Sequence, residues 1–246
     1  MKYNICVPIA VKNDNILEFK KRIEKVVELN PNLIELRYDY IDNVKFLSQD
    51  FIKELMDNIN SKILVIFTFR DQNEGGQMKI DEASHYNLLK ILVLSQPDYL
   101  DIEMNTEENF LAELIELAIQ NNVKLIFSYH NFDETPSYEV ISNRIHRFLK
   151  KLKNEFRLGS KELEKIILKL IFKANSFEDN LTTLKICREF SKKINVISFC
   201  MGSLGIFSRV LCVLSGSFLT YGSIVEETAP GQINFKSLRE ALKFFE

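Results

Sequence analysis

The sequence predicts an α/β fold, a (β/α)8 TIM barrel, and three patterns along its 246 residues lead to this prediction. Short apolar runs alternate with longer segments of helical period. There are eight such runs, which is the strand number of this barrel, and most of them start about 30 residues apart, the repeat of a βα unit. Within several runs, polar and apolar residues alternate, so that one face of the strand is polar.

The strands are expected where β-branched and other apolar residues cluster between turn residues. In chain order they are Tyr3–Ile9, Leu33–Asp39, Ile63–Arg70, Tyr99–Met104, Val123–His130, Ile166–Phe172, Asn195–Met201 and Phe218–Ser223. The second strand shows the alternation best, because Glu35, Arg37 and Asp39 share one face and apolar residues share the other. The next three strands repeat it with the polar pairs Thr68 and Arg70, Asp101 and Glu103, and Ser128 and His130.

The helices are expected between these strands, where apolar residues recur three and four positions apart. In chain order they are Ile16–Leu29, Gln49–Asn60, Glu82–Ser95, Glu107–Gln120, Tyr138–Phe156, Phe177–Lys192, Ile206–Ser215 and Phe235–Phe245. The segment 147–165 is unusually long and strongly charged, and we interpret it as a lengthened, solvent-exposed helix. No proline- or serine-rich linker divides the chain, so residues 1–246 are predicted to form a single domain.

Composition and charge narrow the class of protein. Hydrophobic residues make up 46% of the chain and charged residues 27%, as in globular proteins. The formal net charge of -2 gives no reason to expect nucleic acid or a membrane as a partner. No apolar run approaches the ~20 residues that span a bilayer, and the N-terminus has no signal-peptide pattern, so we expect a cytoplasmic protein. The cysteines have neither disulfide nor metal-ligand spacing and are expected to be reduced.

A doubly wound open sheet would show the same alternation of strands and helices, but it usually has a glycine-rich turn after its first strand. Here that turn reads Pro8-Ile9-Ala10-Val11, and the chain contains neither G-x-G-x-x-G nor a Walker A sequence. The barrel is therefore favoured, and a nucleotide cofactor is not expected.

Short motifs in the polar strands and in the loops after them resemble those of a known family. They are Glu35-Leu36-Arg37, Phe67-Thr68-Phe69-Arg70, Glu74-Gly75-Gly76, Asp101-Ile102-Glu103, Ser128-Tyr129-His130-Asn131-Phe132 with Thr135-Pro136, Gly205-Ile206-Phe207-Ser208-Arg209 and Ala229-Pro230-Gly231-Gln232. In identity and order they are similar to the motifs of type I 3-dehydroquinate dehydratase.

That resemblance implies a barrel enzyme, usually a homodimer, that acts as a lyase in the shikimate pathway of chorismate and aromatic amino acid biosynthesis. The family removes water from 3-dehydroquinate through a lysine imine, a Schiff base, and releases 3-dehydroshikimate. The lysine itself supplies the electrophile, so neither a metal nor an organic cofactor is expected.

Two lysines of the sixth strand are candidates for the imine. Ile167, Lys169, Ile171 and Lys173 share one face of that strand. In the family the lysine precedes a short apolar run and then a polar loop, and this register favours Lys169 over Lys173. Burial between isoleucines would disfavour its ammonium form and leave an amine for nucleophilic attack. Residues 165–167 read Lys-Ile-Ile where the family usually has Gly-Ala-Asp.

His130 is expected to transfer the protons. It ends the fifth strand, where barrel enzymes place catalytic groups, and an imidazole titrates near neutrality. The resemblance implies that Glu74, in the loop after the third strand, orients it, and the alternative for Glu74 is an exposed loop acid. His85 and His146 lie in helical patterns and are interpreted as surface residues, and no pair of histidines has metal-ligand spacing.

The resemblance also assigns the substrate-binding residues. Arg209, near the start of the helix after the seventh strand, corresponds to the family's clamp on the substrate carboxylate. Thr228 and Gln232 correspond to a lid that closes over the ring, and Thr228 stands where many relatives have Ser. Three further residues either bind ring hydroxyls or hold one another by ion pairing, namely Glu35, Arg37 and Arg70.

Two other classes of function remain open. A class I aldolase would also use a barrel lysine, but it would normally need a phosphate-binding loop after the last two strands, and the glycines there form no G-x-G. A non-catalytic binding barrel would need neither a buried lysine nor a strand-end histidine. Met201 and Tyr221 fit either the lining of a ring pocket or the core.

Overall fold

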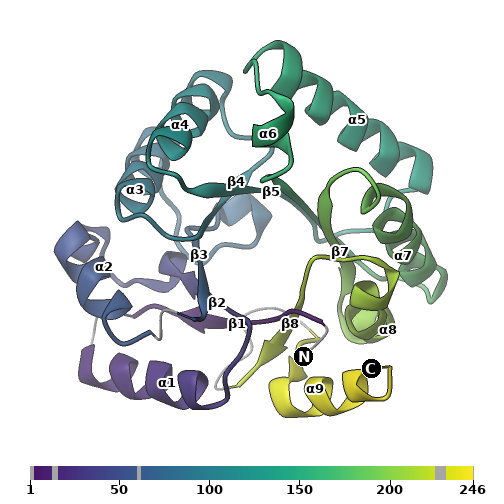
Figure 1. Cartoon of the computed structure of the whole chain (residues 1–246), viewed down its shortest axis with the longest axis horizontal. Helices are drawn as coiled ribbons and strands as arrows, with labels where there is room; N and C mark the ends of the chain where they lie inside the picture. The colour runs from purple at the N-terminus through teal and green to yellow at the C-terminus, as the bar shows by residue number, and fades with distance from the viewer. Residues whose placement is uncertain (1–2, 13–15, 60–61, 225–230, 246) are drawn as a thin grey trace.

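The strands form a parallel sheet that curls into a barrel, and the helices lie outside it (Figure 1). The computed structural model describes residues 3–12, 16–59, 62–224 and 231–245. Its strands are β1 (Ile5–Ala10), β2 (Leu33–Arg37), β3 (Leu64–Thr68), β4 (Tyr99–Glu103), β5 (Lys124–Asn131), β6 (Ile167–Lys173), β7 (Asn195–Met201), β8 (Thr220–Ser223) and β9 (Ile233–Asn234). Its helices are α1 (Ile16–Glu28), α2 (Gln49–Met56), α3 (Glu82–Leu94), α4 (Glu108–Gln120), α5 (Tyr138–Asn154), α6 (Ser160–Leu163), α7 (Glu178–Phe190), α8 (Ile206–Leu211) and α9 (Phe235–Lys243). The predicted barrel is confirmed.

The order of the strands is β7-β6-β5-β4-β3-β2-β1-β8-β9, and the paired neighbours are parallel. Strands β7 and β8 meet at a junction where the backbone N of Phe218, just before β8, donates to the carbonyl oxygen of Val196 on β7 at 2.7 Å. The carboxyl ends of the barrel strands therefore point the same way, and the loops that follow them surround one mouth.

Strand pairing places polar side chains in layers inside the barrel. Glu103 of β4 lies beside Ser128 of β5, and Ser128 lies beside Lys169 of β6. Parallel neighbours in register point to the same side of the sheet, so these three side chains converge in the interior. Closer to the mouth, His130 lies beside Ile171. The alternation in the sequence thus determines which groups face the site.

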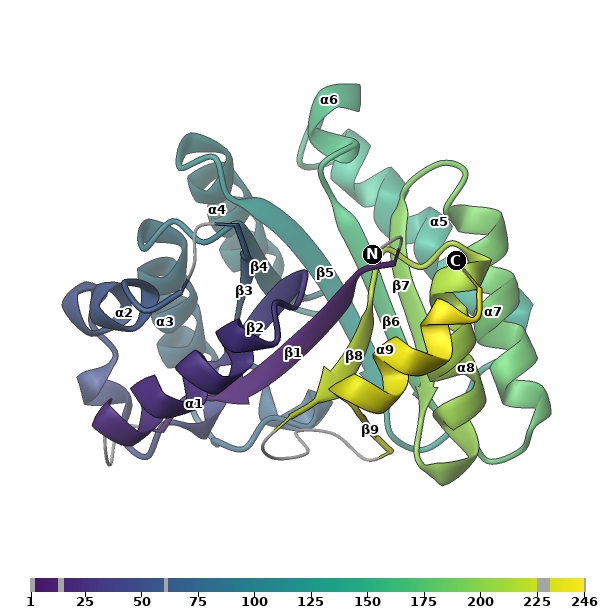
Figure 2. The same ribbon diagram turned by 60° about the horizontal axis from the view of Figure 1, so that its bottom comes forward.

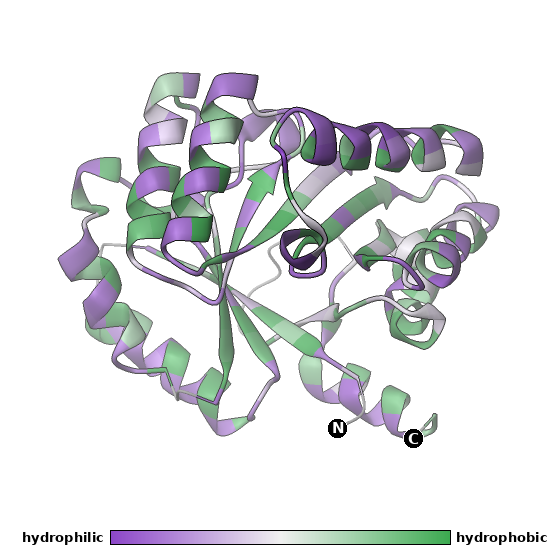
Figure 3. Ribbon diagram, turned by 45° about the horizontal axis from the view of Figure 1, so that its top comes forward, coloured by the Kyte–Doolittle hydropathy of each residue, from purple (hydrophilic) through white to green (hydrophobic). Residues whose placement is uncertain are grey.

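The helices cover the outer face of the sheet with their apolar sides (Figure 2; coloured by hydropathy in Figure 3). In α1 the buried residues Phe19, Ile23 and Val26 follow a helical spacing. In α5, the ring of Phe148 contacts that of Phe127 on β5, with centroids 5.0 Å apart. Burying one such side chain contributes ~1.5–3 kcal/mol, so this outer shell stabilises the barrel and leaves the mouth available for polar groups.

The segment between the fifth and sixth strands differs from the prediction. It is not one lengthened helix, because α5 ends at Asn154 and the short α6 follows after Gly159. In the turn between them Arg157 adopts a left-handed conformation with φ 55°. The turn brings Leu158 back onto α5, where its backbone N donates to the carbonyl oxygen of Leu152 at 3.0 Å and its side chain is buried. The chain therefore leaves the helix in a turn that buries the apolar Leu158, in a segment whose other residues are mostly charged.

Two smaller differences lie at strand ends. The second strand stops at Arg37, because residues 38–40 form a 3-10 helix that turns Asp39 back toward the Arg37 guanidinium. The short β9, which the sequence did not predict, pairs Ile233 with Gly222 and Asn234 with Ser223. Two residues are too few to show a periodic pattern.

Each helix within the described ranges is too short or too polar to cross a bilayer. The cysteines Cys6, Cys187, Cys200 and Cys212 are free thiols and all are buried.

Candidate active site

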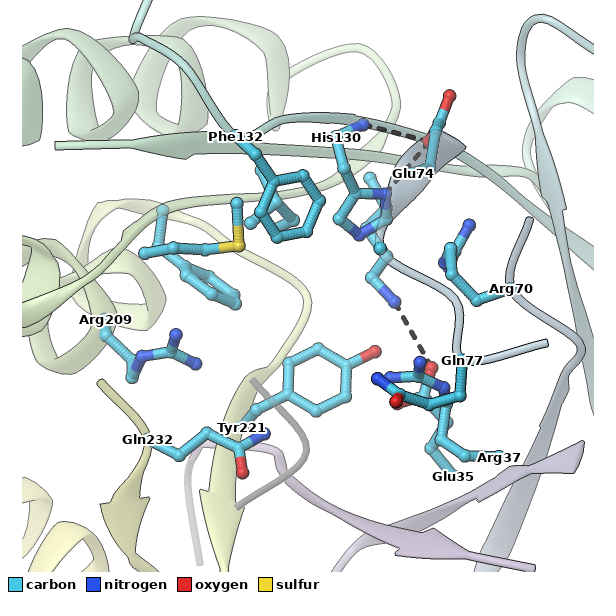
Figure 4. Close-up of a pocket in the computed structure, with 15 residues that line it drawn as sticks. Glu35, Arg37, Arg70, Glu74, Gln77, His130, Phe132, Arg209, Tyr221 and Gln232 are labelled. Atoms are coloured by element: carbon cyan, nitrogen blue, oxygen red, sulfur yellow. Dashed lines mark hydrogen bonds and ion pairs between the residues drawn. The ribbon is translucent and has the colours of Figure 1, made fainter. Parts of the chain in front are cut away.

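A pocket of about 210 Å³ lies where the carboxyl ends of the strands meet (Figure 4). It is lined by Glu35, Arg37, Arg70, Glu74, Gly75, Gln77, His130, Phe132, Lys169, Ile171, Phe199, Met201, Arg209, Tyr221 and Gln232. The lining includes every predicted site residue except Thr228, which lies outside the described residues. The structure therefore brings together residues that are spread over almost 200 positions of the chain, from Glu35 to Gln232.

Lys169 of β6 lies at the base of this pocket, and its side chain is 6% exposed. Its Nζ atom is 2.8 Å from Oδ2 of Asp101 and 3.2 Å from Oε1 of Glu35. The apolar surroundings expected for this amine are therefore wrong, because two carboxylates reach it across the barrel. Lys173, the other candidate, is exposed at the end of β6 and does not line the pocket.

A layer of charged and polar groups beneath the pocket holds the Asp101 carboxylate. Nη2 of Arg70 lies 2.7 Å from Oδ2 of Asp101, and Nη1 lies 2.6 Å from Oε1 of Glu103. Ser128 Oγ donates to Oδ1 of Asp101 at 2.6 Å. Burial by itself would raise the pKa of Asp101, but the positive charges of Arg70 and Lys169 outweigh it, so the pKa lies well below its usual range. Asp101 is thus a fixed negative charge beside the lysine.

His130, which is half-buried, and the buried Glu74 form a pair at one side of the pocket. Nδ1 of His130 is 3.0 Å from Oε2 of Glu74, and the backbone N of His130 donates to the same oxygen at 3.0 Å. With Nδ1 held in this way, Nε2 is the nitrogen available to a substrate. Burial lowers the pKa of His130 well below its ordinary value, and the cations Arg70 and Lys169 lower it further. Burial raises the pKa of Glu74 to about 8, although Arg70 opposes this shift.

Two glycines allow Glu74 to reach the histidine. Gly75 has φ 87°, a left-handed conformation that ends the 3-10 helix Gln72–Glu74. A Cβ atom at Gly75 would lie 2.3 Å from the Phe132 ring, and one at Gly76 would lie 1.9 Å from the carbonyl oxygen of Arg70. The loop can therefore fold this tightly only with glycine at both positions.

The roles left open for Glu35 and Arg37 can be compared with their contacts. The Arg37 guanidinium forms two parallel hydrogen bonds with the carboxylate of Asp39, both 2.8 Å long. Glu35 accepts from Thr68 Oγ1 at 2.8 Å and pairs with Lys169. Glu35 and Arg37 are therefore each held by an ion pair, but their partners are Lys169 and Asp39 rather than one another, and both side chains also line the pocket.

Arg209 lies on the side of the pocket opposite Glu35 and Arg37 (Figure 4). It comes from α8, is almost completely buried, and places its guanidinium carbon 4.5 Å from the centroid of the Phe199 ring. Gln232, which precedes β9, lies next to it at the rim. A buried cation and a lysine in the lining of one pocket suit an anionic substrate that carries both a carboxylate and a carbonyl carbon for the amine to attack.

A match to a known family accounts for this arrangement. A sequence model described as "Type I 3-dehydroquinase" matches residues 5–246. The chain belongs to the type I 3-dehydroquinase family.

Curated relatives in the type I 3-dehydroquinase family are similar over nearly the whole chain. The 3-dehydroquinate dehydratase of Listeria monocytogenes serotype 4b is 32% identical over 244 residues, which cover 97% of this chain and 90% of that protein. The 3-dehydroquinate dehydratase of Thermococcus onnurineus is 31% identical over 224 residues, which cover 91% of this chain and 92% of the relative. Among solved structures, the type I 3-dehydroquinate dehydratase of Clostridium difficile superposes with a TM-score of 0.84 at 28% identity, covering 99% of this chain and 92% of that one.

Some pocket residues of this type I 3-dehydroquinase were not predicted. Gln77 and Phe132 line the pocket, and both lie within or beside motifs that the sequence contains, which is the signal that could have found them. Tyr221 and Met201, for which the core was the alternative, line it as well. Within the described ranges, no group of three or more His, Cys, Asp or Glu side chains is placed to hold a metal ion.

The interpretation of His85 as a surface residue is wrong. It is buried in α3, and its Nε2 atom lies 2.8 Å from the carbonyl oxygen of Phe69 at the end of the third strand. The helical spacing from His85 to the buried Leu89 and Leu92 could have shown that it faces the barrel. His146 of α5 is exposed, as predicted.

Proposed function

We propose that Lys169, His130 and Glu74 carry out the dehydration of 3-dehydroquinate to 3-dehydroshikimate, the hydro-lyase reaction of this family in the shikimate pathway. The observation that carries the proposal is that Lys169 lines one pocket together with the His130–Glu74 pair and the buried Arg209. The Clostridium difficile relative was crystallised with covalently modified comenic acid, and a reactive nucleophile in that pocket would agree with such a modification.

In the first step the Lys169 amine attacks the ketone carbon of the substrate. The ammonium must first lose a proton, and Asp101 and Glu35 are the carboxylates within contact distance of Nζ. His130 relays protons from the nitrogen to the ketone oxygen, which takes up the two that the nitrogen loses and leaves as water. A carbon–nitrogen double bond then joins the lysine nitrogen to the former ketone carbon as an iminium. Its positive charge replaces that of the ammonium, so the same carboxylates stabilise it.

In the second step His130 removes a proton from C2, the carbon next to the iminium. The electron pair moves into the iminium, which becomes an enamine. The enamine then expels the C1 hydroxyl, which takes the proton back from His130 and leaves as water. Hydrolysis of the remaining imine releases 3-dehydroshikimate and restores the lysine.

The other predicted residues would bind and enclose the ring. Arg209 would bind the carboxylate on C1 with its planar fork of donors. Glu35, Arg37 and Arg70 would face the ring hydroxyls at the other end of the pocket, and Thr228 and Gln232 would close over the substrate. A structure of the complex with 3-dehydroquinate would test each of these contacts.

We further propose a single-domain, cytoplasmic homodimer that acts on a free small molecule, without nucleic acid or membrane as a partner. Exposed apolar side chains on α7 and around α8 supply a surface for a second copy: Phe177, Leu181, Leu204, Ile206 and Phe207. The rings of Phe177 and Phe207 lie 4.9 Å apart, so the two helices share this surface. Sedimentation of the purified protein would measure its oligomeric state.

Borohydride trapping tests the role of the lysine. We predict that Lys169→Ala abolishes turnover of 3-dehydroquinate and borohydride-dependent labelling, because the amine is the nucleophile. Lys173→Ala is the matched control: Lys173 is on the same strand but exposed, and its removal should change neither. An adduct mapped by mass spectrometry to Lys173 would overturn the assignment, and cleavage of a phosphosugar in place of dehydration would favour an aldolase.

A further inference from the structure

The hydroxyl of Tyr221 is buried in the pocket without a partner. Tyr221 belongs to β8 and is 4% exposed, and its Oη atom has no hydrogen bond to any group in the described part of the chain. A buried hydroxyl without a hydrogen bond destabilises the folded protein, because it has lost its contact with water. Such a group in a pocket wall therefore needs a partner that the free protein does not provide.

The orientation of Tyr221 shows where that partner would be. Its ring spans the pocket, and the hydroxyl points away from Arg209 and Gln232, toward the end where Glu35 and Gln77 lie (Figure 4). The Lys169 ammonium is 4.9 Å from the centroid of the same ring, a distance suited to a cation–π contact. The ring therefore borders the reacting amine, while its hydroxyl points to the end of the pocket that lies away from Arg209.

The proposed binding mode places a specific substrate group at this position. With the C1 carboxylate on Arg209 and C3 joined to Lys169, the next ring carbon away from Arg209 is C4, which carries a hydroxyl. We infer that the Tyr221 hydroxyl hydrogen-bonds the C4 hydroxyl of the substrate and so selects rings that are hydroxylated beside the imine carbon. This inference rests on the proposed reaction at Lys169.

The surroundings of Tyr221 keep the phenol in its donor form. Burial raises the pKa of Tyr221 well above its ordinary value, and the carboxylate of Glu35 raises it further. The hydroxyl can then donate to a substrate oxygen throughout the neutral range. Because a phenol also accepts, either polarity of the bond with a substrate hydroxyl is possible.

Tyr38 provides a comparison within the same molecule. It too is buried with no partner for Oη among the described residues, but it does not line the pocket. Its ring packs edge-on against Phe67, with centroids 5.1 Å apart. A substitution by phenylalanine removes only a buried hydroxyl at both positions, so the two variants differ in whether that hydroxyl faces the substrate.

The test compares Tyr221→Phe and Tyr38→Phe on 3-dehydroquinate and on its 4-deoxy analogue. For Tyr221→Phe we expect kcat/KM on 3-dehydroquinate to fall about fivefold, the factor for one neutral hydrogen bond. On the 4-deoxy analogue the same variant should match the wild type, because the partner is already missing. Tyr38→Phe should match the wild type on both compounds. Both variants should unfold at the wild-type temperature or above it, since each loses an unpaired buried hydroxyl.

The outcomes separate this inference from the proposed function. A change of less than twofold for Tyr221→Phe on 3-dehydroquinate, or an equal loss on both compounds, overturns the contact with C4. Borohydride labelling of Lys169 is measured in the same samples. Its absence from the wild type would overturn the proposed reaction, whereas labelling in every protein with unchanged kinetics of Tyr221→Phe would overturn only the role of Tyr221.

Discussion

The imidazole of His130 is held neutral at the pH where the protein is expected to work. Burial, with the cations Arg70 and Lys169, lowers its pKa well below 6.5, so a proton is bound only in acid. The neutral ring can accept a proton at Nε2 while Nδ1 stays against Glu74. Glu74, whose pKa burial raises to about 8, releases its own proton only in weakly alkaline solution. The pair therefore contributes one ionisation in acid, that of His130, and one in weakly alkaline solution, that of Glu74.

These ionisations predict the pH dependence of the reaction. We expect kcat/KM to rise with pH through a step well below pH 6.5, as His130 loses its proton, and to change again near pH 8, as Glu74 loses its own. Because the pKa of His130 is lowered, its neutral form, which acts as the base, persists to lower pH. Activity is therefore expected to rise with pH at the first step. Glu74→Gln cannot ionise and should lose only the step near pH 8. A lower step at or above pH 6.5 would contradict the role of His130.

Among the elements, α8 delivers Arg209 to the pocket because it begins soon after β7 ends. The chain turns at Gly205, where a Cβ atom would lie 2.5 Å from the carbonyl oxygen of Cys200. The side-chain oxygen of Ser208 then accepts from the backbone N of Cys200 at 2.9 Å. The position of the guanidinium thus depends on a tight contact between one helix and the strand before it.

We predict that Arg209→Lys weakens the binding of 3-dehydroquinate, since it keeps the charge but loses the planar fork. Arg209→Ala should cost more, on the order of 2 to 5 kcal/mol, because the substrate carboxylate would be buried without a cation. Steady-state constants measure both effects, and Arg188→Ala on the exposed side of α7 serves as the control. Constants for both Arg209 variants within a factor of two of wild type would remove this residue from carboxylate binding.

Strand parity explains why much of the site could be predicted. A period of two residues determines which side chains share a face, so Glu35 and Arg37 could be placed on the polar face of their strand from sequence alone. For Lys169, parity gave only a face shared with Ile167, Ile171 and Lys173, and the register of the family motif favoured it over Lys173. Parity does not determine which partner each one meets. The pairing of Lys169 with Asp101 depends on how β4, β5 and β6 align across 68 positions of the chain, and no local pattern records that alignment.

Local patterns also failed where tertiary packing overrode them. The pattern of the charged segment 147–165 predicts one helix, but the turn that buries Leu158 divides it into two. His85 is a polar residue in a helical pattern and was predicted to be at the surface. In the structure its ring is buried and hydrogen-bonds to the carbonyl oxygen of Phe69 after the third strand. In both cases the deciding contact comes from a residue's place in the folded barrel. For His85 the helical spacing to Leu89 and Leu92 indicates the inward face, but no local pattern identifies the acceptor that it meets there.

In the molecule as a whole, the interior of the barrel is charged near the mouth rather than apolar throughout. Arg70 lies between Asp101 and Glu103, and all three are buried. We predict that Arg70→Met lowers the free energy of unfolding by ~3–5 kcal/mol, because two carboxylates lose their cation in a medium that solvates them poorly. Denaturant unfolding measures this change. Arg147→Met, at an exposed position of α5, should leave the free energy within ~0.5 kcal/mol of wild type.

The two ends of the described chain meet on the face opposite the mouth, where the Tyr3 hydroxyl donates to the carbonyl oxygen of Phe245 at 3.3 Å (Figure 2). The turn between α5 and α6 also precedes a strand and so lies on that face. A short peptide joining the ends, with new ends opened in that turn, would give a circular permutant in which each pocket residue keeps its strand or helix. The order in which the chain passes through the barrel is thus separable from the chemistry at its mouth, so the permutant should still dehydrate 3-dehydroquinate.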